Sequence, residues 1–224
     1  MLPLFHDFAD ETVLVFGGGR VGCRKARFFA QEADVIVVGA AFVDELRVAA
    51  QIKAHLSPDD LPGWFDRASP ALVVAATDDG ALNETIEKEA EKRNILVNRA
   101  DRHGNRGVGS VVVPATVRDG EVVAAVGTGG RSPALSKYLR QRIEPLLSRA
   151  DAMAELTAEV RQELKNEGVP ANVRRNAIRA VVESESVWDA IEHEQSERDS
   201  CGDFVGITAR AKAERIVADV LNRD

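Results

Sequence analysis

The sequence has little cysteine and no long apolar run. Its two cysteines, Cys23 and Cys201, lie in unrelated contexts, which indicates neither a disulfide framework nor a pair of metal ligands. Such a chain suits a reducing compartment, so we expect a cytoplasmic protein. No apolar run approaches the roughly 20 residues of a membrane span. The N-terminal segment carries acids without a basic stretch, so we expect neither membrane association nor a signal peptide.

Positive charge is also in the minority. The chain has 29 Lys and Arg residues against 36 Asp and Glu residues, and its formal net charge is -7. This balance argues against nucleic acid as a partner, and any anionic ligand must be met by a local cluster of basic side chains. The four histidines are scattered without the spacing of a metal site, so no metal site is predicted.

What the sequence does contain, near its start, is a glycine-rich turn. Val13–Phe16 is a continuous apolar run, which is typical of a strand buried on both faces of a parallel sheet. Gly17, Gly19 and Gly22 follow it with G-x-G-x-x-G spacing. In a dinucleotide-binding turn the first glycine makes the bend, the second lets a pyrophosphate approach the backbone, and the third packs the helix on the strand.

The helix expected to start near Arg20 would point its N-terminal amides at that pyrophosphate. The alternative is a turn without a ligand, but three glycines carry a large entropic cost for a plain strand-to-helix turn. We therefore predict a nicotinamide dinucleotide site in which the cofactor-binding residues of this turn are Gly17, Gly19, Arg20, Val21 and Gly22.

The second predicted strand, Asp34–Val38, ends without the usual acid. An NAD site commonly places Asp or Glu at this point to bind the ribose hydroxyls, whereas this chain has Gly39 and Ala40, and Asp44 is the first carboxylate beyond. The ribose contact is therefore unassigned, and a charge that would exclude a 2′-phosphate is missing.

Two further apolar runs, Ala71–Ala76 and Ile95–Asn98, predict strands that end at the same edge of the sheet. Ligands bind at the carboxyl ends of parallel strands, so Thr77, Asp78 and Asn98 become candidate cofactor contacts. Asp78 is equally well explained as a helix N-cap, and Asp79 is better explained in that way. Before Ala71 we expect a helix over Val43–Gln51, a weak strand over Lys53–Leu56 and an irregular connector over Pro58–Pro70. After Ala76 we expect a helix that ends near Arg93.

The parallel pattern stops near Val113. Beyond a basic loop we expect strands over Ser110–Val113, Ala115–Val117 and Val122–Val126, with a hairpin turn at Asp119-Gly120, and then a helix from Ser132-Pro133 to about Leu147. Charged helices follow over Ala150–Asn166, Val173–Ile191 and Phe204–Leu221, the last two separated by the polar stretch Glu194–Gly202. We predict an α/β chain: a Rossmann-type parallel sheet (residues 1–113), a small α+β dimerisation region (114–148) and a helical C-terminal region (149–224). The middle region is too small to be an independent core, so we expect a homodimer.

Several motifs occur together in order: LPLF, GGGRVGCRK, ALVVAATDD followed by LN, LVNRAD, VVVPA and VGTGGRSPALSKYLR. Over Leu2–Leu147 the chain resembles the precorrin-2 dehydrogenase and sirohydrochlorin ferrochelatase family, which also forms the N-terminal part of siroheme synthases. The resemblance implies an NAD-binding Rossmann domain, a dimerisation domain and a helical end. It also implies NAD-dependent dehydrogenation of the tetrapyrrole precorrin-2, and it leaves open whether Fe²⁺ is inserted as a second substrate.

The family's catalytic aspartate lies in a V-N-x-x-D motif, which here corresponds to Asp101. The family's hydroxyl residue before the glycine pair corresponds to Thr128. The carboxylates of precorrin-2 call for cations on the rim, and the candidates, each equally explained as a solvated surface charge, are Arg102, Arg106, Arg131 and Lys137. If iron is inserted, Asp101 would receive pyrrole protons, with His103 as an assistant.

The loop from Asp101 to Pro114 is longer than is usual in the family, and Val113 stands where an aromatic residue is common. Two other functions fit part of the pattern: a non-catalytic NAD-sensing module that acts through the helical tail, and a different small-molecule dehydrogenase. The motif around Asp101 disfavours the sensor, and the GTGGRSPALS segment disfavours the other dehydrogenase.

Overall fold

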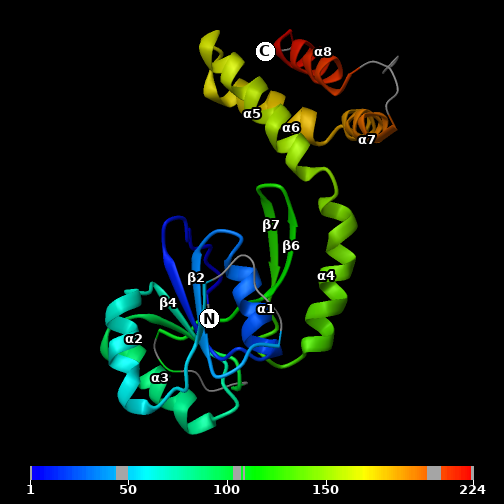
Figure 1. Cartoon of the computed structure of the whole chain (residues 1–224). Helices are drawn as coiled ribbons and strands as arrows, with labels where there is room; N and C mark the ends of the chain where they lie inside the picture. The colour runs from blue at the N-terminus through cyan, green and yellow to red at the C-terminus, as the bar shows by residue number, and fades with distance from the viewer. Residues whose placement is uncertain (1, 44–49, 103–106, 108, 201–207, 223–224) are drawn as a thin grey trace. The chain divides into compact units, whose positions relative to one another are not determined.

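The computed structural model describes residues 2–43, 50–102, 107, 109–200 and 208–222, without the side chains of residues 195 and 197–200 (Figure 1). The chain divides into two compact units. The first comprises Met1–Val113 with Gly129–Arg131, and the second comprises Pro114–Thr128 with Ser132–Asp224.

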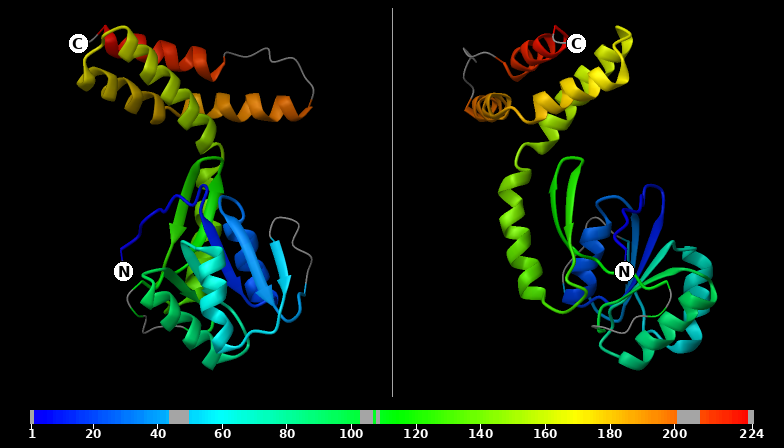
Figure 2. Two further views of the ribbon diagram at one scale, coloured as in Figure 1. Left: turned by 60° about the vertical axis from the view of Figure 1, so that its left-hand side comes forward. Right: turned by 180° about the vertical axis from the view of Figure 1, so that it is seen from behind.

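The first unit is built on a five-stranded parallel sheet in the order β3-β2-β1-β4-β5 (Figures 1 and 2). The strands are β1 (Thr12–Phe16), β2 (Asp34–Gly39), β3 (Ala50–Lys53), β4 (Leu72–Ala75) and β5 (Leu96–Arg99). Successive side chains of β1 enter different cores: Val13 and Val15 pack with helix α1 (Arg20–Phe29), whereas Leu14 and Phe16 pack with α2 (Leu61–Ala68) and α3 (Gly80–Lys92). Both faces of the sheet are therefore covered, which explains the continuous apolar run. The predicted Rossmann-type α/β fold is confirmed.

Two predictions for the segment after β2 were wrong. Pro58–Pro70 is not an irregular connector, because the short helix η1 (Pro58–Asp60) and then α2 occupy most of it. Ser57 starts this helical stretch, since its backbone N–H and its hydroxyl donate to Asp60 Oδ2 at 3.0 and 2.6 Å. Leu61 and Phe65, one helical turn apart, are then buried together.

The third strand also lies earlier than predicted. β3 begins at Ala50, so Gln51 belongs to the sheet and not to the end of a helix, and most of the helix expected over Val43–Gln51 lies outside the described residues. As an edge strand, β3 is largely exposed, so it lacks the apolar signal that marks β1 and β4.

The second unit starts with a hairpin of β6 (Ala115–Asp119) and β7 (Val122–Val126), followed by α4 (Pro133–Leu147). Ser132 caps α4, because its hydroxyl accepts a hydrogen bond from the Leu135 N–H at 3.2 Å. The strand predicted over Ser110–Val113 was wrong except for one bridge between Ser110 and Val97. Past that bridge, Val111 and Val113 turn their side chains into the core beside α1.

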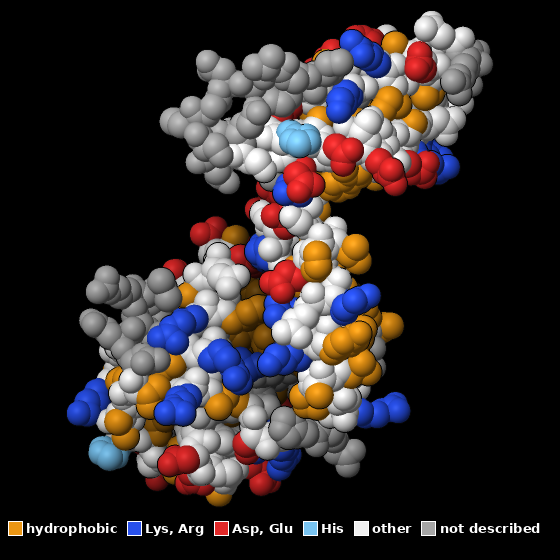
Figure 3. Space-filling model, turned by 90° about the vertical axis from the view of Figure 1, so that its right-hand side faces the viewer, with side chains coloured by type: hydrophobic (Ala, Val, Ile, Leu, Met, Phe, Trp, Pro, Cys, Tyr) orange, Lys and Arg blue, Asp and Glu red, His pale blue; other side chains and the backbone are white. Residues whose placement is uncertain are grey.

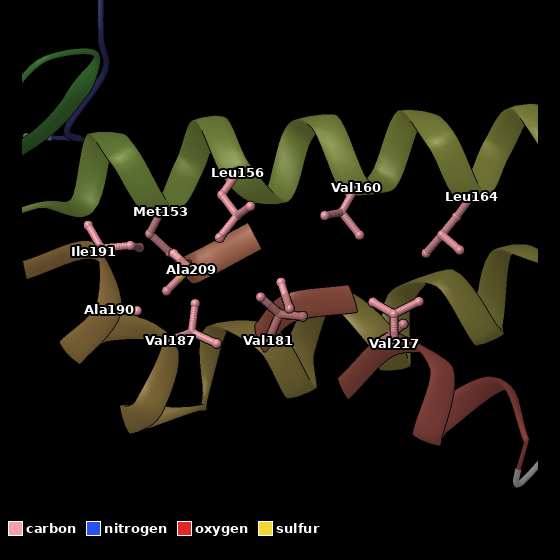
Figure 4. Close-up of a cluster of buried hydrophobic side chains, with 12 residues drawn as sticks. Met153, Leu156, Val160, Leu164, Val181, Val187, Ala190, Ile191, Ala209 and Val217 are labelled. Carbon is pink, nitrogen blue, oxygen red and sulfur yellow. The ribbon is translucent and has the colours of Figure 1, made fainter. Parts of the chain in front are cut away.

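The rest of the second unit is a helical cluster of α5 (Ala150–Asn166), α6 (Ala171–Val182), α7 (Glu185–Ser200) and α8 (Ala209–Leu221). Figure 4 shows its core, where Leu156, Val160 and Leu164 of α5 point toward side chains of the other three helices. The predicted helix Val173–Ile191 is in fact two helices, and the stretch expected to separate it from the last helix is helical up to Ser200. The break between α6 and α7 is stabilised by the Trp188 indole N–H, which donates to the Val182 carbonyl at 2.9 Å. Among the described residues, no helix has both the length and the apolar character to cross a membrane.

Candidate functional site

The three glycines of the turn after β1 have three different environments. Gly17 has φ +116°, and a Cβ there would lie 2.3 Å from the carbonyl oxygen of Ala76 at the end of β4. A Cβ on Gly22 would lie 1.9 Å from the carbonyl oxygen of Gly17, so this glycine brings α1 onto the strand. A Cβ on Gly19 would meet nothing within 4 Å. The fold requires the first and third glycines, whereas the second leaves exposed backbone for a ligand.

The N-terminus of α1 fits an anion. The N-cap residue Gly19 offers no side-chain acceptor, and the first turn holds no acid, so no side chain of the turn caps the amides there. Arg20 and Val21 are exposed beside them. The basic side chains of α1 are Arg20, Arg24, Lys25 and Arg27, of which Arg27 lies in the last turn. Arg20, the first residue of the helix, is the basic side chain beside the open amides. Figure 3 shows one face of the molecule, with many Lys and Arg side chains in the lower part of the view.

The packing of two further glycines, Gly18 and Gly39, on each other was not predicted from the sequence, although Gly39 was noted as standing where the usual acid is missing. A Cβ on Gly18 would lie 2.1 Å from the carbonyl oxygen of Ala41, and a Cβ on Gly39 would lie 2.7 Å from the Gly18 nitrogen. The end of β2 is thus packed directly on the glycine turn. No side chain fits where an NAD site usually carries its acid, and the sequence signal for this was the pairing of GGG with a glycine at the end of the second strand.

At the end of β4, Thr77 faces the protein. Its hydroxyl donates to Asn83 Oδ1 at 2.7 Å, and the Asn83 amide donates back to the Thr77 carbonyl at 3.0 Å. Asp79 is the helix cap, because its carboxylate accepts from the Ala81 and Leu82 N–H groups at 2.8 and 3.1 Å. The Thr77 side chain therefore holds the rim in shape, and Asp78 is left exposed between the two.

Asn98 holds a buried acceptor within the first unit. Its residue is only 5% exposed, and its Nδ2 donates to the Val111 carbonyl at 2.8 Å. Its Oδ1 is buried and has no hydrogen-bond partner among the described residues. A buried acceptor without a partner is costly, and a ligand N–H would satisfy it. The open backbone at Gly19 fits a pyrophosphate, and Asn98, near the carboxyl end of β5 at the same edge of the sheet, offers a further acceptor.

Asp101 is the exposed end of an ion-pair chain. Arg99 Nε and Nη2 donate to its two carboxylate oxygens at 2.8 and 2.7 Å, and Arg99 Nη1 donates to Glu87 Oε2 at 2.7 Å. The hydrogen bonds from Arg99 hold the pKa of the Asp101 carboxyl below its ordinary value, and the same bonds raise the pKa of Arg99. Asp101 is therefore ionised at neutral pH. Neither Arg99 nor Glu87 was predicted as part of the site, because their pairing depends on how α3 lies against β5.

The predicted substrate cations are placed differently from one another. Arg102 pairs with Glu87 at 3.2 Å and with Glu84 at 3.9 Å, so part of its charge is already neutralised. Arg131 is exposed in the segment that belongs to the first unit, and Lys137 is exposed on α4. Arg106 and His103 lie outside the described residues.

Thr128 belongs to the second unit, where it supports the start of α4. Its hydroxyl lies 3.0 Å from the Ser136 hydroxyl and donates to the Ser132 carbonyl at 3.1 Å. In the part of the chain that the structure describes, no three His, Cys, Asp or Glu side chains are grouped to hold a metal ion.

Comparison with known proteins places this geometry in context. Residues 4–115 match a family model described as "Putative NAD(P)-binding". The chain is 35% identical over 198 residues to a precorrin-2 dehydrogenase of Methanosarcina barkeri, with 84% of this chain and 85% of the relative covered. It is 34% identical over 176 residues to siroheme synthase 1 of Serratia proteamaculans, with 73% of this chain covered but only 34% of the relative. The chain thus spans about a third of that synthase.

A solved structure described as SirC, precorrin-2 dehydrogenase, has the same fold. It superposes with a TM-score of 0.63 at 23% identity, over 83% of this chain and 91% of the other.

Proposed function

Because this chain belongs to the precorrin-2 dehydrogenase family of siroheme biosynthesis, we propose that it oxidises precorrin-2 to sirohydrochlorin with NAD⁺ as the acceptor. The reaction moves one hydride to the nicotinamide and releases one proton, so that the products are sirohydrochlorin, NADH and H⁺. One observation carries this proposal. The open turn at Gly19 and the ionised carboxylate of Asp101 follow strands β1 and β5 at the same edge of one parallel sheet.

The cofactor is held by backbone more than by side chains. The amides at the start of α1 would bind the pyrophosphate, and the bare Cα of Gly19 would admit it. Asn98 Oδ1 would accept a hydrogen bond from an N–H or O–H group elsewhere on the cofactor. NAD⁺ supplies the hydride acceptor when it is bound. We propose NAD over NADP from the family resemblance. The backbone packing at Gly39 leaves no room for the acid that would otherwise enforce this choice.

Asp101 acts on the substrate side of this rim. Its carboxylate accepts a hydrogen bond from the tetrapyrrole and takes or relays the proton to solvent, a role worth typically ~10²–10⁴ in rate. Within the first unit, the exposed cation Arg131 and the uncompensated part of Arg102 meet the substrate's carboxylates. Iron insertion is a second candidate activity, because an ionised carboxylate on the rim can receive the pyrrole protons that Fe²⁺ displaces.

We also propose that the protein is a homodimer. The 15 residues of α4 include none that is buried, and Leu135, Tyr138 and Leu146 on it are 46%, 57% and 77% exposed. The β6–β7 hairpin beside it has only two strands, which are marginally stable alone. A second copy that covers both would bury this apolar surface. Sedimentation at low concentration tests this: a folded monomer would contradict it, and Leu146→Asp should weaken the dimer.

The test of the activity itself is turnover of precorrin-2 by the purified chain. We expect the absorbance of NADH at about 340 nm, the standard assay for reduced nicotinamide, to rise together with the absorbance of sirohydrochlorin. About one NADH should form for each sirohydrochlorin. Addition of Fe²⁺ to the same mixture then asks whether siroheme forms. NAD binding without turnover would instead favour the non-catalytic sensor.

A further inference from the structure

Arg99 is a buried arginine whose three nitrogens are all in use. Its side chain is only 4% exposed, and it closes a bidentate pair with Asp101 while its third nitrogen binds Glu87. Glu87 is itself 9% exposed on α3, and Asp101 is 32% exposed. The chain of charges therefore runs from the interior to the rim, and Asp101 is its most exposed member.

Stability is a weak reason for such an arrangement. The free-energy cost of removing two charges from water often exceeds the attraction between them. Replacing such a pair by well-packed apolar residues is often neutral or stabilising. Val97, two residues earlier on the same face of β5, is itself apolar and buried. A buried Arg–Glu pair at the last residue of β5 is thus better explained by what it does to Asp101.

We propose that Arg99, held from behind by Glu87, is a positioning residue that fixes the plane of the Asp101 carboxylate toward the substrate. This role rests on the proposed function. A bidentate guanidinium leaves one lone pair on each carboxylate oxygen for the substrate and prevents rotation of the group. A displacement of 1 Å in a reacting group can cost on the order of 10² in rate, so a fixed carboxylate plane matters for turnover.

The charges around Asp101 agree with this role. Arg99 from β5 faces it directly; behind Arg99 stand Glu87 and, through it, Arg102, with Glu84 of α3 near Arg102. Without Glu87, the guanidinium would be a buried cation with a single exposed partner. Without Arg99, Asp101 would lose both of its bidentate bonds and would titrate closer to an ordinary carboxyl.

The decisive variant removes the pair as a whole. Arg99→Met alone strands Glu87 as a buried charge and can unfold the protein, but Arg99→Met with Glu87→Leu replaces both charges by apolar groups and should fold. We expect this double variant to melt no lower than the single variant and to bind NAD as the wild type does. Its kcat should fall about tenfold or more, and the acid limb of its pH–rate profile should move to higher pH. Arg99→Lys, which keeps the charge but not the fork, should leave the acid limb near that of the wild type while kcat still falls.

A matched control lies at the C-terminal end of α3, where Arg93 is the C-cap residue. Arg93 pairs with Glu89 and with Asp66, and neither pairs with Asp101. Arg93→Met with Glu89→Leu should leave kcat and the acid limb unchanged. If the Arg99 and Glu87 double variant is folded and keeps wild-type kcat and pH profile, the pair is only structural and the proposal is wrong.

A second readout separates this proposal from the activity. The ¹³C signal of the Asp101 carboxyl can be followed against pH in the substrate-free protein. A titration midpoint that rises in the double variant, and not in the Arg93 control, supports the positioning of Asp101 by Arg99 even if the wild type fails to oxidise precorrin-2. An unchanged midpoint overturns it.

Discussion

A Cβ on Gly22 would lie 1.9 Å from the carbonyl oxygen of Gly17, so the helix and the strand touch through bare backbone at this point. A Cβ on Gly19, three residues earlier, would meet no atom within 4 Å. One motif thus contains glycines that serve packing and a glycine that serves a ligand, and substitution can tell the two apart.

Gly19→Ala should fold normally and bind the cofactor poorly. Its φ of -74° suits any residue, and the added methyl group meets no atom within 4 Å, so the free energy of unfolding should change by less than about 1 kcal/mol. The methyl group would stand where the pyrophosphate approaches, so we expect NAD affinity to fall by about tenfold, or 1.4 kcal/mol. Gly19→Asp adds a negative charge and should abolish binding. Calorimetric titration measures both.

Gly22→Ala is the matched control for that experiment. It must displace the Gly17 carbonyl, so it should lower the melting temperature before any ligand is added. Normal NAD binding by Gly19→Asp would show that the turn is not the cofactor site.

Asn98→Leu should separate apo stability from cofactor stabilisation. It removes the donor to the Val111 carbonyl, which should cost about 1 to 3 kcal/mol in the free protein. It also removes the buried Oδ1 that awaits a donor, so the rise in melting temperature on adding NAD should be smaller than in the wild type. An equal rise in both proteins would mean that this atom does not meet the cofactor.

The glycine turn, β1, β4 and the hairpin could be predicted because local sequence determines them. Buried parallel strands are continuous apolar runs, and Asp119-Gly120 is a dipeptide typical of hairpin turns. The connector after β3 could not, because the burial of Leu61 and Phe65 depends on the sheet they pack against. The exclusion of an acid at Gly39 depends on a contact with Gly18 across two strands. The partner of Asp101 likewise comes from α3, far from it in sequence.

Lys25 gives a pH-dependent prediction. Burial, and secondarily the charge of Arg24, lowers its pKa to about 8 from an ordinary 10.5. At pH 7 the folded protein must therefore hold a charged amine in an unfavourable place, and Lys25→Met should raise the melting temperature. Between about pH 8 and 10.5 the unfolded wild type binds more protons than the folded one, so wild-type stability rises with pH and the advantage of the variant shrinks.

The control is Lys88→Met, because the Lys88 side chain is 64% exposed. Its stability over the same pH range gives the baseline for the loss of an exposed lysine. A constant difference between Lys25→Met and the wild type from pH 7 to pH 10 would contradict the assigned environment of Lys25.

Asp101→Asn should separate binding from chemistry. The amide keeps the size of the carboxylate but cannot accept the proton, so dehydrogenation should fall by on the order of 10² or more while NAD binding stays nearly unchanged. Because the folded pKa of Asp101 is depressed, its ion pair stabilises the protein above the ordinary carboxyl range and is lost as pH falls through the folded value. The stability difference between wild type and variant should therefore be largest near neutral pH and disappear in acid. Turnover within a few-fold of the wild type would remove Asp101 from the mechanism.

The most direct test of the function is a single mixture of the purified protein, precorrin-2 and NAD⁺, followed by absorbance. We expect NADH and sirohydrochlorin to appear together in equal amounts, and neither to form when the cofactor is left out. Bound NAD⁺ with no loss of precorrin-2, with either NAD⁺ or NADP⁺ supplied, would contradict it.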